Sequence, residues 1–140
     1  MEKVSTLFGR ILLGHIFLMA GISKLGAGYA GTQGWMEAMG IPGALLPAVI
    51  ALEIGAGAAL VLGFKTRLAA LALAGFSIIA AMIFHSEFSD QMQLIMFMKN
   101  FAIAGGLLFV ATFGAGSWSL DARFTNKIAY NAQSASTPLA

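Results

Sequence analysis

A single carboxylate, Glu53, lies in the middle of the apolar stretch "LLPAVIALEIGAGAALVLGF". It is nine residues into a segment long enough to cross a bilayer, so at about 1.5 Å per residue it lies roughly 13 Å below the membrane boundary. A charge at that depth costs at least about 2.5 kcal/mol on insertion scales. We therefore expect Glu53 to face the interior of a helix bundle, either paired with a cation or protonated.

Other polar side chains can reach the same region from neighbouring segments. Lys24 lies near the end of the first apolar segment, and Lys99 lies near the start of the last one. The long aliphatic stems of these lysines let their ammonium groups lean into a bundle as easily as outward to water. The sequence predicts a polar cluster in the outer half of the bundle. Its candidate binding residues are Lys24, Trp35, Glu53, His85, Gln93, Lys99 and Asn100.

This predicted cluster has two interpretations, which the residues alone leave open. Intramembrane ionisable groups commonly mark functional sites, so the cluster could hold a small polar or quinone-like head group, or form a proton path. Alternatively, Glu53 and a lysine could form an ion pair that only fixes the register of the helices.

The two histidines, His15 and His85, raise the question of haem, because imidazole is a common axial ligand. His15 belongs to the inner half of its segment and His85 to the outer end of another, so one haem cannot use both. The eight methionines are more typical of gap-filling between helices than of haem ligation. The chain has no cysteine and its acidic residues lack the clustered spacing of metal ligands. We expect no encoded cofactor and no metal site, and we disfavour haem.

The composition sets the environment in which these residues must be positioned. Of 140 residues, 59% are hydrophobic and only 10% are charged, with a mean hydropathy of +0.84. Soluble domains carry roughly a quarter charged residues, so this is a membrane composition. The net charge of +2 is too small and too spread out to indicate a nucleic-acid partner, and the partner indicated is the lipid bilayer.

Long uncharged segments predict an all-α integral membrane protein with four transmembrane helices in up-down-up-down order. The expected spans are about residues 7–26, 44–64, 67–84 and 96–118 of one domain, residues 1–121. Between the first two spans, Thr32 could cap a short interfacial helix that carries Trp35. Residues 122–140 lose hydrophobicity and are expected to form a mobile polar tail. The small-residue stripe Ala51, Gly55, Ala59, Gly63 is expected to pack against another span.

Lysine and arginine predict the orientation. The cations Lys3, Arg10, Lys65, Arg67, Arg123 and Lys127 fall on one side of the expected spans, and only Lys24 and Lys99 fall toward the other. By the positive-inside rule, both termini are cytoplasmic, and residues 27–43 and 85–93 are outside. The turn "GFKTR" is better explained as part of this signal than as an anion site.

Three stretches together resemble one known family: "GRILLGHIFLMAGISKL", "LEIGAGAALVLGFKTRLAALALA" and "FMKNFAIAGGLLFVATFGAGSWSLD". In this order and spacing, over about residues 7–121, they resemble the DoxX family of small bacterial inner-membrane proteins. The resemblance implies a four-helix protein of the inner membrane. Some members are named as small subunits of a quinol oxidase or of a thiosulfate:quinone oxidoreductase, so it also implies a quinone-linked redox role.

Two functions follow as hypotheses. In the first, the chain is a redox-associated subunit that binds quinone or anchors an oxidoreductase partner; no redox centre is encoded, so an electron carrier would be bound or lie on the partner. In the second, it is a non-enzymatic membrane module, either a small-solute or lipid carrier or a scaffold, that acts as a homo-oligomer. The sequence does not decide whether the chain is an enzyme.

Overall fold

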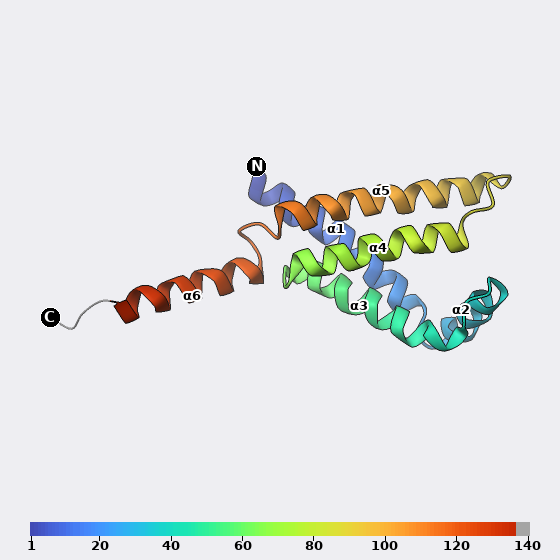
Figure 1. Cartoon of the computed structure of the whole chain (residues 1–140), viewed down its shortest axis with the longest axis horizontal. Coiled ribbons are helices and arrows are strands. Elements are labelled where there is room, and N and C mark those ends of the chain that lie inside the picture. The colour runs from blue at the N-terminus through green and yellow to red at the C-terminus, as the bar shows by residue number, and fades with distance from the viewer. Residues whose placement is uncertain (137–140) are drawn as a thin grey trace.

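Helices account for all regular structure in residues 1–136, the part of the chain described by the computed structural model (Figure 1). The elements in order are α1 (Glu2–Ser23), α2 (Ala27–Ala38), the 3-10 turn η1 (Gly43–Leu45), α3 (Leu46–Leu62), α4 (Thr66–Phe84), α5 (Gln91–Phe113) and α6 (Leu120–Ser136). These described residues contain no strand, which confirms the predicted all-helical class.

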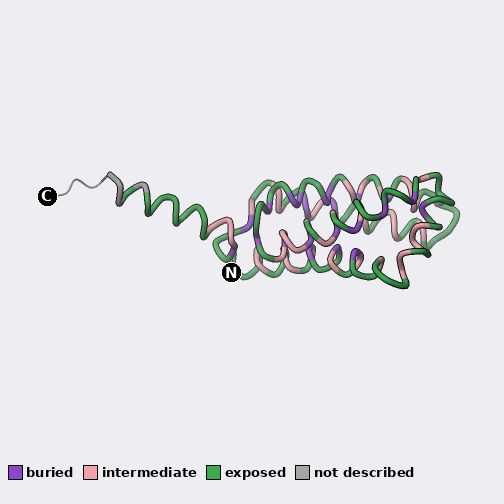
Figure 2. Tube along the Cα trace, turned by 90° about the horizontal axis from the view of Figure 1, so that it is seen from below, coloured by how far each residue is buried: buried purple, intermediate pink, exposed green. Residues whose placement is uncertain are grey.

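Four of the helical segments are long and apolar enough to cross a membrane: Glu2–Ser23, Gly43–Leu62, Thr66–Phe84 and Gln91–Phe113. Large apolar side chains such as Leu12, Met82 and Phe109 are exposed, as lipid-facing residues are. Figure 2 shows that exposed positions run along the whole length of the bundle. The prediction of four spans is confirmed.

The fourth span is displaced from its predicted bounds, residues 96–118, toward the N-terminus. It begins at Gln91 because the Asp90 side chain accepts a hydrogen bond from the Met92 amide at 2.8 Å and so caps the helix. It ends at Phe113 because Gly114 adopts φ +85°. Local capping chemistry therefore sets both ends of this helix, whereas the hydropathy pattern alone runs on to Trp118.

The spans pack chiefly as two pairs, α1 with α3 and α4 with α5, and α3 joins the pairs through α4. Between α1 and α3, Gly14 and Gly57 let the backbones approach closely. A Cβ atom at Gly14 would lie 2.8 Å from the Gly57 carbonyl oxygen. The stripe expected on α3 is correct only in part. Ala59 packs against core residues and Gly63 is buried against Arg10. Gly55, in contrast, is exposed and meets nothing, and Gly57 lies in the contact instead.

Two apolar clusters stabilise this arrangement. The larger one, around Leu60, Leu73 and Leu107, joins α3, α4 and α5. The smaller one contains Met36, Leu46 and Ile50, and it fixes α2 against the start of α3. The packing of Met36 holds α2 close to the bundle end where α4 and α5 are joined (Figure 1). We call this the α2 end.

The helix α2 is longer than the short helix that the sequence predicted to begin after Thr32. It begins at Ala27, and Thr32 lies inside it with its hydroxyl donating to the Gly28 carbonyl at 2.9 Å. Thr32 is therefore not the N-cap that the sequence suggested. Gly40 follows the helix with φ +78°, a left-handed conformation that glycine adopts readily at the end of a helix.

The opposite end, which we call the terminal end, brings together α1, the turn between α3 and α4, and the start of α6. Asp121 accepts hydrogen bonds from the backbone amides of Lys65 and Thr66 at 2.8 and 2.9 Å. The buried Arg10 donates through Nη2 to the Trp118 carbonyl at 2.7 Å. Burial alone would raise the pKa of Asp121, but the two amide hydrogen bonds and the charge of Arg10 outweigh it and hold the pKa below its usual value.

Beyond this junction, α6 continues away from the bundle (Figure 1). The helix was not predicted: residues 120–136 are helical, and Asp121 ties the first turn to α4, whereas the mobility of the tail stays a prediction. Residues 137–140 of the predicted tail lie outside the described residues.

Candidate functional site

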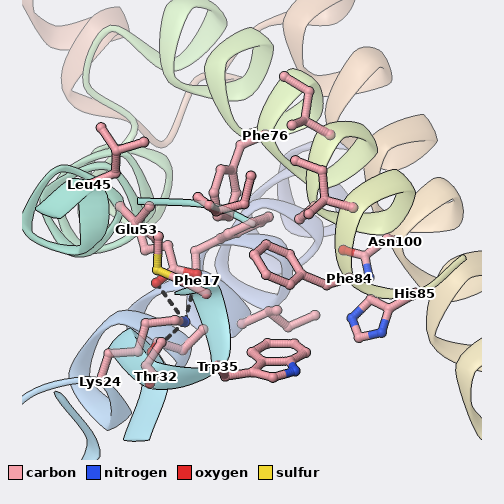
Figure 3. Close-up of a pocket in the computed structure, with 18 of the residues that line it drawn as sticks. Phe17, Lys24, Thr32, Trp35, Leu45, Glu53, Phe76, Phe84, His85 and Asn100 are labelled. Carbon is pink, nitrogen blue, oxygen red and sulfur yellow. Dashed lines mark hydrogen bonds and ion pairs between the residues drawn. The ribbon is translucent and has the colours of Figure 1, made fainter. Parts of the chain in front are cut away.

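A cavity of about 400 Å³ opens at the α2 end of the bundle. Every helix from α1 to α5 contributes to its wall, and α2 supplies Thr32 and Trp35 (Figure 3). Most of the wall is apolar, with Phe17 from α1, Val49 from α3 and Phe76 from α4. The volume lies within the range of pockets that hold small organic ligands.

The main polar feature of the cavity is an ion pair between α1 and α3. Lys24 Nζ lies 2.9 Å from Glu53 Oε1 and 2.8 Å from Oε2. Glu53 is only 4% exposed, whereas the Lys24 side chain keeps about a fifth of its surface, 21%, accessible. The pair explains how the apolar stretch of α3 tolerates a carboxylate, because the ammonium group compensates its charge inside the bundle.

In this pair the hydrogen-bond donors of Lys24 are all used, whereas the acceptor positions of Glu53 are not. Lys24 Nζ also donates to the Ala20 carbonyl at 3.0 Å, so its three N–H groups have three acceptors. A carboxylate has about four acceptor positions, and within the described residues Lys24 is the side chain that hydrogen-bonds Glu53. The pair therefore presents spare acceptor capacity to the cavity and little spare donor capacity.

Aromatic rings separate the ion pair from a second polar group. Trp35 of α2 packs on Phe84 of α4, with ring centroids 4.6 Å apart, and lies 6.2 Å from the ring of His85. Figure 3 shows Lys24 and Glu53 on one side of these rings, and His85 with Asn100 on the other. The cavity thus has polar groups at two separated positions and an apolar surface between them.

The second polar group is oriented by residues on α5. His85 Nδ1 lies 2.8 Å from Gln93 Oε1, so the amide oxygen accepts and Nδ1 carries the proton. This leaves His85 Nε2 as an acceptor in the neutral ring. Asn100 donates through Nδ2 to the Met96 carbonyl at 2.9 Å, and its oxygen has no hydrogen bond within the described residues.

Most of the candidate residues gather at this cavity, but not all of them. Lys24, Trp35, Glu53, His85 and Asn100 line it. Gln93 does not line the cavity, but it forms a hydrogen bond with His85.

Lys99 is exposed on α5 and is absent from the cavity wall, so the structure does not bring it to Glu53. His15 is also exposed, on the outer surface of α1.

The apolar wall and Thr32 were not foreseen from the sequence. Thr32, Phe84 and Ile103 line the cavity from three helices. No sequence signal separates a cavity-facing Phe or Ile from the many lipid-facing ones in an apolar segment. Thr32 could have been found as a polar residue one turn before Trp35 on the same helix.

The four apolar spans and the buried ion pair define a small polytopic membrane protein. A family model described as DoxX matches residues 5–86, and the chain belongs to this family. It is 50% identical to inner membrane protein YqjF of Escherichia coli (strain K12) over 127 residues, which cover 91% of this chain and 96% of that protein. It is 36% identical to inner membrane protein YphA of the same organism over 129 residues, with 87% of this chain and 91% of YphA covered. No solved structure matched the chain.

Proposed function

We propose that the cavity at the α2 end binds the head group of a membrane quinol, and that the chain serves an oxidoreductase partner as its quinol-binding subunit. In this proposal the partner receives the two electrons of the quinol, which becomes the quinone, and the two hydroxyl protons are released to water. The chain itself supplies the position and orientation of the head group.

The observation that carries the proposal is the pair of separated acceptor positions. A quinol has two hydroxyl groups on opposite sides of one ring. Glu53 offers free acceptor capacity on one side of the cavity, and His85 Nε2 offers it on the other. At the ion pair, a quinone, which only accepts hydrogen bonds, would find no spare donor, because the three N–H groups of Lys24 already have acceptors. The ion-pair side of the cavity therefore favours the reduced form.

The apolar wall supports the same ligand class. Phe17, Phe76 and Ile83 are among the apolar residues that line the cavity. An aromatic ring with an isoprenoid tail buries its apolar surface against such a wall and its hydroxyl groups against the polar ends. A strongly charged solute would leave most of this wall uncovered.

The orientation of the cavity is part of the proposal. The terminal end carries the exposed cations Lys3, Lys65, Arg67, Arg123 and Lys127. By the positive-inside rule, this end faces the cytoplasm and the four spans run up-down-up-down. The helix α2 then lies at the non-cytoplasmic surface of the inner membrane. Quinol would then be bound in the outer half of the inner membrane.

Tryptophan fluorescence can test this function, because Trp35 lines the cavity and the other tryptophan, Trp118, lies at the terminal end. Purified protein in nanodiscs would be titrated without oxygen with decylubiquinol and, separately, with decylubiquinone. We expect saturable quenching that disappears in Trp35→Phe and an affinity for the quinol at least about fivefold higher, which corresponds to roughly 1 kcal/mol.

A matched pair of variants on α4 separates cavity binding from partition into lipid. Ala80 lines the cavity, whereas Ala72 is exposed on the same helix. Ala80→Phe should fill the cavity and abolish saturable quenching, and Ala72→Phe should leave it unchanged. Equal quenching of both variants, or tighter binding of the quinone, would contradict the proposal.

A further inference from the structure

An open groove of about 740 Å³ lies at the terminal end, remote from the cavity described above. Its wall is formed by the start of α4, the end of α5, the connection after α5 and the first turns of α6. Because α4 begins and α5 ends here, the groove lies at the level where the spans leave the membrane. Figure 1 shows α6 leaving the bundle at the same level.

Two cations line this groove without an acidic partner. Lys65 and Arg67 are both exposed, and neither forms an ion pair with a carboxylate within the described residues. The backbone of Lys65 is held in the left-handed region, at φ +44°. Arg67 lies along the connection, where a Cβ atom at Gly114 would be 3.4 Å from its Nε. Lys65 Nζ lies 5.8 Å from the centroid of the Phe64 ring, and both cations line the groove at the start of α4.

Asp121 also lines the groove, but its charge is already engaged. One carboxylate oxygen accepts the Lys65 amide and the other accepts the Thr66 amide, at the positive end of the α4 dipole. The carboxylate thus compensates the helix terminus rather than the side chains of Lys65 and Arg67. These two side chains remain available for another anion.

The rest of the groove is apolar and exposed. Leu68 and Phe113 line it on the bundle side, with 66% and 74% of their surface accessible, and Phe124 and Ile128 line it on α6. A small hydrophilic anion would leave these side chains uncovered. A phospholipid has the complementary chemistry, with an anionic head group attached to apolar chains.

We propose that this groove binds an anionic phospholipid of the surrounding membrane. Its phosphodiester lies between Lys65 and Arg67, and its acyl chains run along Leu68 and Phe113 into the bilayer. The exposed Lys3, Arg123 and Lys127 give the whole terminal end a positive field, which attracts anionic lipids to this surface. The site is independent of the quinol site, because the two lie at opposite ends of the spans.

Trp118, 54% exposed in the connection beside the groove, can report on the lipid that occupies it. The experiment uses the full chain with Trp35→Phe, in phosphatidylcholine nanodiscs that contain brominated phosphatidylglycerol or brominated phosphatidylcholine at equal mole fraction. Bromine quenches tryptophan at short range. We expect at least threefold preferential quenching by phosphatidylglycerol, because a cation close to an anionic surface contributes roughly a factor of five.

The variant Lys65→Gln with Arg67→Gln should lose this preference. The control, Lys3→Gln with Lys127→Gln, removes the same charge from the same end without touching the groove wall, and it should keep the preference. If both variants lost the preference for phosphatidylglycerol equally, the lipid would be attracted by the overall charge of this end rather than by the groove, and the proposed site would be refuted. Equal quenching by the two lipids in the Trp35→Phe protein would overturn it without any groove variant.

Discussion

The Lys24–Glu53 pair predicts a specific pattern of stabilities. Removing one partner of a buried ion pair typically costs about 3–5 kcal/mol, whereas removing both is often nearly neutral. Glu53 is 4% exposed, but Lys24 retains 21% of its side-chain surface, so water relieves part of the penalty. We expect Glu53→Gln to lower the free energy of unfolding by about 2–3 kcal/mol and the double variant Glu53→Gln/Lys24→Met by less than about 1 kcal/mol.

Unfolding in mixed micelles by titration with a denaturing detergent would measure these differences. Lys99→Met is the matched control, because Lys99 is exposed on α5 and does not line the cavity. It should have little effect alone and no coupling with Glu53→Gln. If the effects of Glu53→Gln and Lys24→Met simply add, the two residues do not stabilise one another and the reasoning fails.

Three further predictions concern the spans and their ends. Reporter fusions after Phe64 and after Asp90 should report opposite sides of the membrane; the same side for both would refute the proposed order of spans. Gly14→Ala should destabilise the protein by about 1–3 kcal/mol because its Cβ meets backbone of α3, whereas Gly55→Ala, with open space around it, should be neutral in the same unfolding assay. Because the pKa of Asp121 is lowered in the fold, its stabilisation is complete above its ordinary pKa of 3.8 and is lost as pH falls through the lowered value. Asp121→Asn should flatten the acid limb of a melting-temperature profile, and an unchanged limb would contradict this.

Hydropathy and charge were sufficient to predict the four spans and the burial of Glu53. A long uncharged segment has few alternatives to a spanning helix, and a carboxylate inside one must be compensated. The partner of Glu53 could not be chosen in the same way. Lys24 and Lys99 are both near the right depth, and only the rotation of each helix about its axis decides which one faces the bundle. That rotation is set by contacts such as Gly14 with Gly57, which a local pattern does not reveal.

The junction at the terminal end could not be predicted from the sequence for a related reason. Asp121 stabilises the start of α4, 55 residues earlier in the chain at Thr66, and nothing near Asp121 indicates this contact. The helix α6 was missed because its polar composition is also typical of a mobile tail. Its first turn is anchored by tertiary hydrogen bonds rather than by a hydrophobic face.

Photolabelling would test the central claim most directly, namely that the cavity at the α2 end holds a quinol head group. The parent protein in nanodiscs would be irradiated with an azido-ubiquinol, kept reduced, and the labelled peptides would be identified by mass spectrometry. We predict labelling at cavity residues such as Trp35 and Phe84, suppressed by excess decylubiquinol and by Ala80→Phe. Labelling confined to lipid-facing residues such as Phe109, unaffected by competitor, would contradict the account.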